Sequence, residues 1–322
     1  MRLARFRAPF DVEIVEVKAP KPGPEEVLIR VRACAICASD KAIIEGGNPN
    51  PGHEIAGEVV DVGGGVKDVK PGQRVTLYWK VGCGECGFCK EGWEVHCQSP
   101  RYLAWNGYAD YILAHERACL PLPEGLDFVE GSLLTDTVGT PLSAVLAAGV
   151  EGKRVAVWGC GPLGLVAVRL SKVRGAKAVA ALDPLPSRRE VAREFGADLT
   201  VNPEEEDPVA VLREFAPPLG PEASICATRA EGTADLALSA TAPGGRLVLI
   251  AGEQRGTGEH IWIMRVLYFR RDVYPEILRV ASEGLVPLRR LVTHIFPLDK
   301  LAEAFDLRFN RPWESLKVVV AP

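Results

Sequence analysis

Four cysteines occur within fifteen residues at a spacing typical of a metal site. They follow the pattern CxxCxxC-x7-C and are Cys83, Cys86, Cys89 and Cys97. Zinc binds four thiolates in tetrahedral geometry, and the short spacers let one loop wrap a single ion. Gly84 and Gly87 permit the tight turns that such a loop needs. A closed set of four ligands leaves no place for substrate, so the spacing predicts a structural zinc site, with an iron–sulfur cluster as the weaker alternative.

A second group of candidate ligands lies upstream. Cys37 and Ser39 are followed by His53 and Glu54. A thiolate, an imidazole and an acid can form a zinc site with an open position, which is the arrangement used in catalysis. Cys34 and Cys37 also form a CxxC pair, but we do not favour redox chemistry, because no strand-to-helix context of the thioredoxin kind is expected around the pair.

A glycine-rich motif predicts a dinucleotide site. GxGxxG spans Gly159 to Gly164, between an expected strand and an expected helix. The candidate cofactor-binding residues within it are Gly159, Gly161, Pro162, Leu163 and Gly164. In such a motif the first glycine makes the turn, the second lets a pyrophosphate approach the backbone, and the third lets helix and strand pack closely. The helix N-terminus then faces the phosphate charge with free N–H groups.

The choice of dinucleotide depends on the end of the next strand. Asp183 is placed to bind the ribose hydroxyls of NAD and to repel the 2′-phosphate of NADP. Arg188 and Arg189 follow, and arginines in this loop can accept that phosphate. The alternative interpretation of Asp183 is a simple turn residue. We expect NAD, with NADP as the less favoured cofactor.

The elements that must position these residues fall into two classes. Residues 12–17, 26–31, 55–62 and 74–79 form short β-branched runs separated by turn clusters, with one short helix expected at 38–45. From residue 153, strands and helices alternate through residue 250, which predicts parallel strands with crossover helices. Thr140 is expected to cap the helix that precedes this region. A helix at 273–283 and a strand at 316–320 are expected to close the chain.

The segment from Gly52 through Glu58, with Gly63 and Val66 at matching offsets, resembles the signature of zinc-containing medium-chain alcohol dehydrogenases. The resemblance covers nearly the whole chain. It implies an α/β protein with a GroES-like, β-rich catalytic domain and a Rossmann doubly wound sheet. We therefore expect a catalytic domain at 1–136 with the zinc lobe at about 80–100, an NAD-binding domain at 137–270 and a return segment at 271–322.

The same resemblance assigns roles to individual residues. It implies that Cys37 and His53 bind a catalytic zinc, that Glu54 can transiently replace water on the metal, and that Ser39 takes the alcohol proton. Cys34 is not a ligand in the family pattern. The family's third ligand precedes the first helix before the glycine motif, where Asp136 is the only ligand-type side chain; a turn role is the alternative.

Two features depart from the family pattern. Ala42 stands where a histidine often completes a proton relay, and the connection after residue 250 is short. Polyol and sugar dehydrogenases of this family often have an acidic third ligand, so the resemblance favours polyols among the alcohol substrates. Trp79, Trp105 and Leu142 are candidates for the wall of the substrate pocket, although large apolar residues are as often ordinary core.

Composition excludes several other classes of protein. The 322 residues carry a net charge of −4, which disfavours nucleic-acid binding and a polybasic membrane surface. No apolar run is long enough to cross a bilayer, and the N-terminus lacks a signal-peptide pattern, so we expect a cytoplasmic protein. Only two methionines beside 25 prolines fit a thermophilic source.

We therefore predict an NAD-dependent alcohol dehydrogenase with two zinc ions per chain, acting as a homodimer or homotetramer. A zinc-free quinone or enone reductase and a non-catalytic dinucleotide-binding protein are the alternatives.

Overall fold

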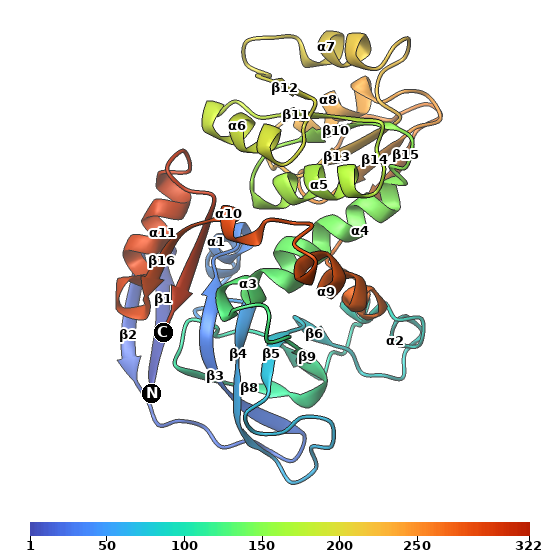
Figure 1. Ribbon diagram of the computed structural model, residues 1–322. Helices are drawn as coiled ribbons and strands as arrows, with labels where there is room; N and C mark the ends of the chain where they lie inside the picture. Colours follow the sequence, from blue (N-terminus) through green and yellow to red (C-terminus); the bar gives the residue numbers. More distant parts are fainter. The chain divides into compact units, whose positions relative to one another are not determined.

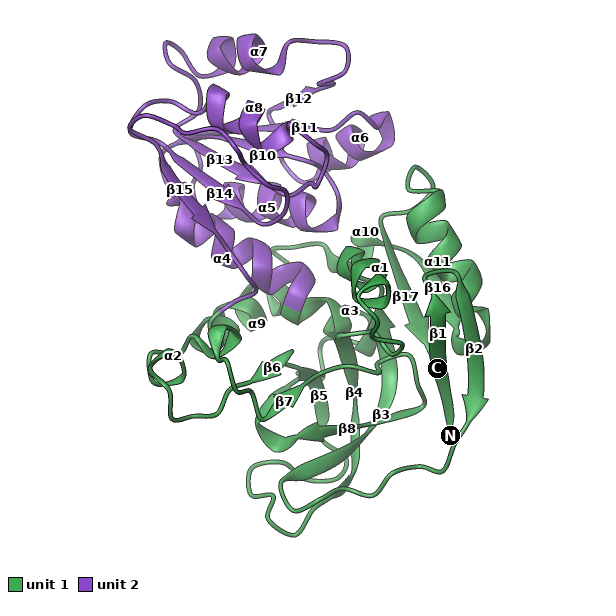
Figure 2. Ribbon diagram, turned by 180° about the vertical axis from the view of Figure 1, so that it is seen from behind, with its two compact units in different colours: residues 1–135, 270–322 green, residues 136–269 purple.

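The computed structural model describes residues 1–322, which divide into two compact units (Figure 2). Unit 1 comprises Met1–Thr135 and Arg270–Pro322, and unit 2 comprises Asp136–Phe269. No helix combines the length and apolar character needed to cross a membrane.

Unit 1 is built around a seven-stranded sheet. Its path runs β16-β17-β3-β4-β5-β9, with β8 also paired to β3, and only β16 and β17 are parallel neighbours. These strands are β3 (Glu26–Ala35), β4 (Glu54–Val62), β5 (Arg74–Leu77), β8 (Tyr111–His115), β9 (Cys119–Pro121), β16 (Val292–Pro297) and β17 (Lys317–Ala321). Two separate pairs complete the β-structure: β1 (Arg2–Ala8) with β2 (Asp11–Glu16), and β6 (Lys80–Val81) with β7 (Tyr102–Leu103).

The helices of unit 1 are short and occupy the connections between strands (Figure 1). They are α1 (Ala38–Glu45), α2 (Gly87–Lys90), α3 (Phe128–Leu133), α9 (Tyr274–Ser282), α10 (Leu288–Leu291) and α11 (Leu301–Asn310). Strand β3 shows why this region folds as a sheet. Val27, Ile29 and Val31 are buried while Arg30 is exposed, which is the period of two expected for a strand with one face in the core.

Unit 2 is a parallel six-stranded sheet with crossover helices. The strand order is β12-β11-β10-β13-β14-β15, so the order reverses at β10. The strands are β10 (Arg154–Trp158), β11 (Ala178–Leu182), β12 (Leu199–Val201), β13 (Ala223–Cys226), β14 (Arg246–Leu249) and β15 (Trp262–Arg265). The helices are α4 (Gly139–Ala148), α5 (Pro162–Val173), α6 (Pro186–Glu194), α7 (Pro208–Phe215) and α8 (Thr233–Ala240). Sheets of this order bind ligands at the carboxyl ends of the strands beside the reversal.

Each unit has its own core. In unit 1 the core includes Ile29, Ile55, Phe305 and Val320, which brings the last strand against residues near the N-terminus. In unit 2 the buried side chains of β10, β11, β13 and β14 pack with those of α7 and α8. Because the two sets share no residue, each unit buries its own apolar side chains.

One helix start differs from the sequence prediction. Thr140 does not cap α4, because the cap position is Val138 and Thr140 lies inside the helix. The chain reaches α4 through a π-helical turn, Leu134–Val138, which directly follows α3. Thr140 followed by proline predicted a helix N-cap, but the residues before Thr140 are already helical.

Candidate metal centres and dinucleotide site

The four clustered cysteines converge in the structure as the sequence predicts. Their sulfur atoms all lie within 4.8 Å of one another. The Sγ atoms of Cys86 and Cys89 are 3.5 Å apart, and those of Cys83 and Cys89 are 3.9 Å apart. Four thiolates at about 2.3 Å from one zinc have sulfur–sulfur separations of about 3.8 Å. The set therefore fits a tetrahedral zinc ion.

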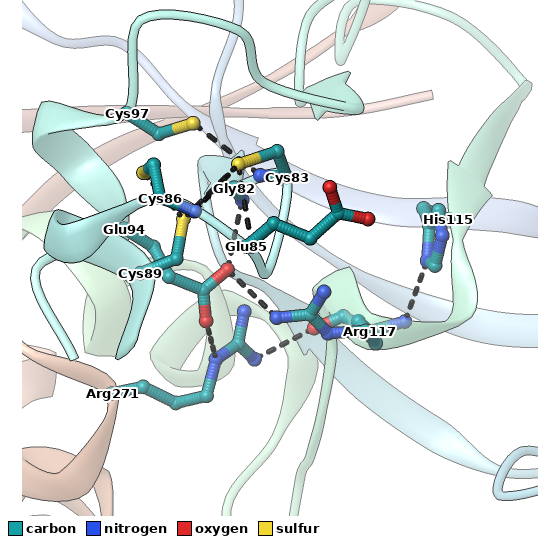
Figure 3. Close-up of polar contacts among 10 residues, drawn as sticks. All are labelled: Gly82, Cys83, Glu85, Cys86, Cys89, Glu94, Cys97, His115, Arg117 and Arg271. Atoms are coloured by element: carbon teal, nitrogen blue, oxygen red, sulfur yellow. Dashed lines mark hydrogen bonds and ion pairs between the residues drawn. The ribbon is translucent and has the colours of Figure 1, made fainter. Parts of the chain in front are cut away.

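Backbone N–H groups of this loop donate hydrogen bonds to the cysteine sulfur atoms, which stabilises thiolates. The N–H groups of Glu85 and Cys86 donate to Cys83 Sγ at 3.5 and 3.4 Å, and the N–H of Cys83 donates to Cys97 Sγ at 3.3 Å (Figure 3). The two bonds to Cys83 lower its pKa to about 6, with the bond from Glu85 as the largest cause. A thiol that loses its proton readily favours metal binding.

Cys37, His53, Glu54 and Asp136 form the second cluster of donor atoms. Their ligand atoms also lie within 4.8 Å of one another. Cys37 is the residue before α1, His53 and Glu54 lie at the start of β4, and Asp136 lies in the π-helical turn. One thiolate, one imidazole and carboxylates are donors that zinc accepts. The structure thus brings together the three predicted ligands and the nearby acid.

Asp40 holds the cluster in place and was not singled out in the sequence. It is fully buried, and its carboxylate accepts hydrogen bonds from the N–H of Cys37 at 2.9 Å, from the N–H of Gly52 at 3.3 Å and from the hydroxyl of Tyr108 at 2.7 Å. Its Oδ1 also lies 3.2 Å from His53 Nδ1. A carboxylate at Nδ1 orients the imidazole and would leave Nε2 as the nitrogen available to a metal ion. The signal in the sequence is an acid three residues into α1, which resembles helix capping.

The two cysteines of the CxxC pair have different environments. Cys34 lies within β3, which ends at Ala35, whereas Cys37 is the residue before α1, which begins at Ala38. Cys34 is fully buried, and this burial raises its pKa well above the ordinary value. A buried, protonated thiol is a poor nucleophile, so the environment of Cys34 disfavours redox chemistry. Ser39 donates its hydroxyl to Cys37 Sγ at 3.2 Å, which places it beside the metal ligands.

Glu54 has an ion-pair partner that the sequence reasoning missed. Lys317 of β17 extends its Nζ to 2.5 Å from Glu54 Oε1, and both side chains are almost completely buried. An unpaired buried carboxylate beside two other acids is costly, and the ammonium compensates its charge. No motif identifies Lys317, because 263 residues separate the two partners in the chain.

Asp136 accepts a hydrogen bond from the hydroxyl of Thr140 at 2.6 Å. This bond uses Oδ1 and fixes the carboxylate, while a carboxylate has further lone pairs on both oxygens. The π-helical turn that carries Asp136 is an irregularity found frequently at functional sites. Asp136 therefore contributes to the turn through Thr140 and also belongs to the donor cluster.

Two tryptophans form an aromatic wall beside His53. Trp105 packs edge-on against the His53 ring with 5.8 Å between centroids, and Trp79 packs edge-on against Trp105 at 6.0 Å. Both tryptophans are partly exposed, whereas Leu142, the third predicted wall residue, is completely buried in α4. The two rings therefore place apolar surface beside the donor cluster.

The glycine motif has the geometry of a phosphate site. Gly159 has φ +90°, a conformation that favours glycine, and a Cβ at Gly164 would lie 1.8 Å from the carbonyl oxygen of Gly159. At Gly161 a Cβ would meet no atom within 4 Å, so space is open where a pyrophosphate would approach. Gly161 precedes α5 and supplies no side-chain cap, which leaves the first N–H groups available to an anion. Pro162 and Leu163 form the first turn of α5.

Asp183 lies directly after β11 and reaches back to the glycine motif. Its Oδ2 accepts from the N–H of Cys160 at 2.8 Å, and its Oδ1 accepts from the N–H of Leu185 at 2.9 Å. Arg188 places Nη1 3.8 Å from the same carboxylate, while Arg189 donates to the carbonyl oxygens of Asp183 and Pro184. Asp183 therefore has the turn role, and Arg188 is the arginine that lies beside its carboxylate.

Comparison with known proteins agrees with this combination of sheet, donor clusters and glycine motif. Residues 23–124 match the family model described as "Alcohol dehydrogenase GroES-like domain", and residues 162–283 match "Zinc-binding dehydrogenase". An L-threonine 3-dehydrogenase from Thermococcus kodakarensis is 31% identical, covering 99% of this chain and 97% of the relative. Human sorbitol dehydrogenase is 32% identical, covering 92% and 90%. The solved alcohol dehydrogenase TADH from Thermus sp. ATN1 has a TM-score of 0.90 at 27% identity, covering 100% and 99%.

These matches define a zinc-type dehydrogenase with a GroES-like domain and a parallel Rossmann sheet. The chain belongs to the zinc-containing medium-chain alcohol dehydrogenase family. The predicted fold class and family are confirmed.

Proposed function

We propose that this protein catalyses reversible hydride transfer between a primary alcohol, secondary alcohol or polyol and NAD. The donor cluster of Cys37, His53, Glu54 and Asp136 carries the proposal. Because Lys317 pairs with Glu54, we take the other three as the metal ligands, and three protein ligands would leave an open position for substrate. A zinc ion bound there would supply Lewis-acid chemistry, and the dinucleotide would supply the hydride acceptor.

The chain's own residues have separate tasks in this reaction. Cys37, His53 and Asp136 bind the metal, and Asp40 orients His53 through Nδ1. Lys317 holds Glu54 by an ion pair and compensates its charge. This pairing supports a resting state in which Glu54 stays near the metal ligands without replacing one of them.

Ser39 is placed to accept the proton of the substrate hydroxyl. Its oxygen lies 3.2 Å from Cys37 Sγ, within the same cluster. The side chain is partly exposed, and Ala42, one turn later in α1, is exposed. We propose that the proton passes from Ser39 directly to water, which removes the need for a histidine at position 42.

The acid ligand and the tryptophan wall support a choice of substrate. Asp136 in place of a thiolate would leave a bound metal a stronger Lewis acid. Trp105 places an apolar ring beside His53, and Trp79 packs against Trp105. Named relatives act on threonine and on sorbitol. We therefore place polyols first among the substrates to be tested.

Self-association is proposed through strand β15. It is the edge strand beside β14, and its apolar side chains Trp262 and Met264 are exposed, Trp262 at 70%. An edge strand with exposed apolar side chains pairs readily with a second copy. We propose a homodimer or homotetramer built on this edge, and a Trp262→Lys variant should lower the mass measured by light scattering.

The main experiment measures metal content, dinucleotide binding and turnover on purified protein. We expect two zinc ions per chain, enhanced NADH fluorescence on binding, and turnover of at least one compound in a panel of alcohols, polyols, sugars and L-threonine. Turnover of quinones or enones without catalytic zinc would support the reductase alternative. Bound dinucleotide without any turnover and with one zinc per chain would support a non-catalytic protein.

A further inference from the structure

Glu94 is a buried residue of the four-cysteine lobe, and its carboxylate is not one of the four candidate metal ligands. It lies in a short 3-10 helix, Glu94–His96, directly before the last ligand, Cys97. Its side chain is only 7% exposed, and three donors converge on it. Buried carboxylates are retained where several hydrogen bonds and charges compensate them.

One of these donors is a backbone N–H at the start of the ligand loop. The N–H of Gly82, the residue before the first ligand, donates to Glu94 Oε2 at 2.8 Å. The N–H of Cys97 donates to the carbonyl oxygen of Glu94 at 3.0 Å. Glu94 therefore connects the two ends of the loop that carries the four cysteines. A metal ion would connect the four cysteines of the same loop.

Gly82 shows how closely the loop packs. A Cβ at this position would lie 2.3 Å from the Sγ of Cys89. The backbone that donates to Glu94 therefore lies directly against a metal ligand. Movement of that ligand has to move the donor to Glu94.

The other two donors are arginines from outside the lobe. Arg117 Nη2 lies 3.0 Å from Glu94 Oε2, and Arg271 Nε lies 3.0 Å from Glu94 Oε1 (Figure 3). Arg271 Nη1 also donates to the carbonyl oxygen of Arg117 at 2.6 Å, and its guanidinium lies 4.4 Å from the centre of the buried Tyr78 ring. Arg271 is thus held by a carboxylate, a carbonyl and an aromatic face.

Arg271 lies where the chain returns to unit 1. Unit 1 resumes at Arg270, and residues Arg271–Val273 form a 3-10 turn that leads into α9. Arg270 also contacts the lobe, with its guanidinium 5.1 Å from the centre of the Trp93 ring. Two consecutive arginines therefore fix the start of the return segment to the lobe.

We propose that the lobe is a metal-dependent anchor for the return segment, with Glu94 as the positioning residue that connects the cysteine loop to Arg271. The metal orders the loop, the ordered loop fixes Glu94, and Glu94 fixes the 3-10 turn and the start of α9. This inference depends on a metal in the lobe and not on the reaction proposed above.

Hydrogen–deuterium exchange over residues 270–282 tests the coupling. We expect zinc removal by a chelator to speed exchange of these amides by roughly tenfold or more, since a charge-assisted contact of this kind is lost. Glu94→Gln should produce a similar increase while the zinc content of the protein stays unchanged. Glu91→Gln is the matched control, because Glu91 is an exposed carboxylate of the same lobe. It should leave the exchange as in the parent protein.

Arg271→Gln tests the same connection from the other side. It should speed exchange in this segment with zinc retained, and chelation should then add little further increase, because the connection is already broken. Unchanged exchange in zinc-loaded Glu94→Gln and Arg271→Gln would overturn the proposal. So would an equal response to chelation in the parent and in Arg271→Gln, and neither result depends on whether any alcohol is turned over.

Discussion

Asp136 is the member of the catalytic donor cluster with the most testable role, because it also fixes the π-helical turn through Thr140. We expect Asp136→Ala to lose the catalytic zinc and at least about a hundredfold in turnover, since a ligand to the reacting metal is removed. The four-cysteine zinc should stay, so metal content should fall from two ions to one per chain. A variant that retained both zinc ions and full turnover would limit Asp136 to the turn and make Glu54 the candidate ligand.

Asp183 is the residue that we expect to determine the choice between NAD and NADP. Its carboxylate lies next to the glycine motif and within 3.8 Å of Arg188, so removal of the acid leaves an arginine facing the ribose position. Asp183→Ala should raise the KM for NAD about tenfold or more and narrow or reverse the preference against NADP, since each lost charge-assisted hydrogen bond contributes about 1.5–3 kcal/mol. Steady-state kinetics with both dinucleotides measures this. Identical constants for parent and variant would contradict the assignment.

At the scale of elements, the lobe from residue 80 to 100 contains only short elements, and we expect its fold to depend on a bound metal. Within it α2 has only four residues, and three of the four cysteines are not fully buried. We expect Cys97→Ser to lower the melting temperature by several degrees and to reduce zinc content, because a structural metal contributes directly to folding. The Michaelis constant for alcohol should change much less. Wild-type melting and wild-type zinc content in this variant would contradict a structural site.

Local patterns predicted most elements, whereas long-range pairs had no local signal. The four cysteines from Cys83 to Cys97 lie in one short segment, and the glycines of the glycine motif lie in another. Each pattern is therefore visible in the sequence. Glu54 and Lys317, or Glu94 and Arg271, meet only through the fold, and nothing near either residue indicates its partner. The Thr140 cap failed for a related reason: propensity indicated a helix start, but α3 and the π-helical turn lead directly into α4.

At the scale of the whole molecule, the four-cysteine lobe and the dinucleotide site belong to different units, and each unit has its own core. The four cysteines of the lobe lie in unit 1, and so do Cys37, His53 and Glu54 of the second cluster, while Asp136 is the first residue of unit 2. The glycine motif and Asp183 also lie in unit 2, and the two cores share no residue. Metal removal should therefore lower the melting temperature of unit 1 and leave NADH binding within about threefold of the parent affinity. Excess NADH should still stabilise the metal-free protein, because a ligand at a hundred times its Kd contributes about 2.7 kcal/mol to the state that binds it. Scanning calorimetry with NADH fluorescence measures both effects on one sample, and reloading with zinc is the control for irreversible damage. Loss of NADH binding on chelation, restored by zinc, would show that the dinucleotide site depends on the metal-bound unit and would contradict this independence.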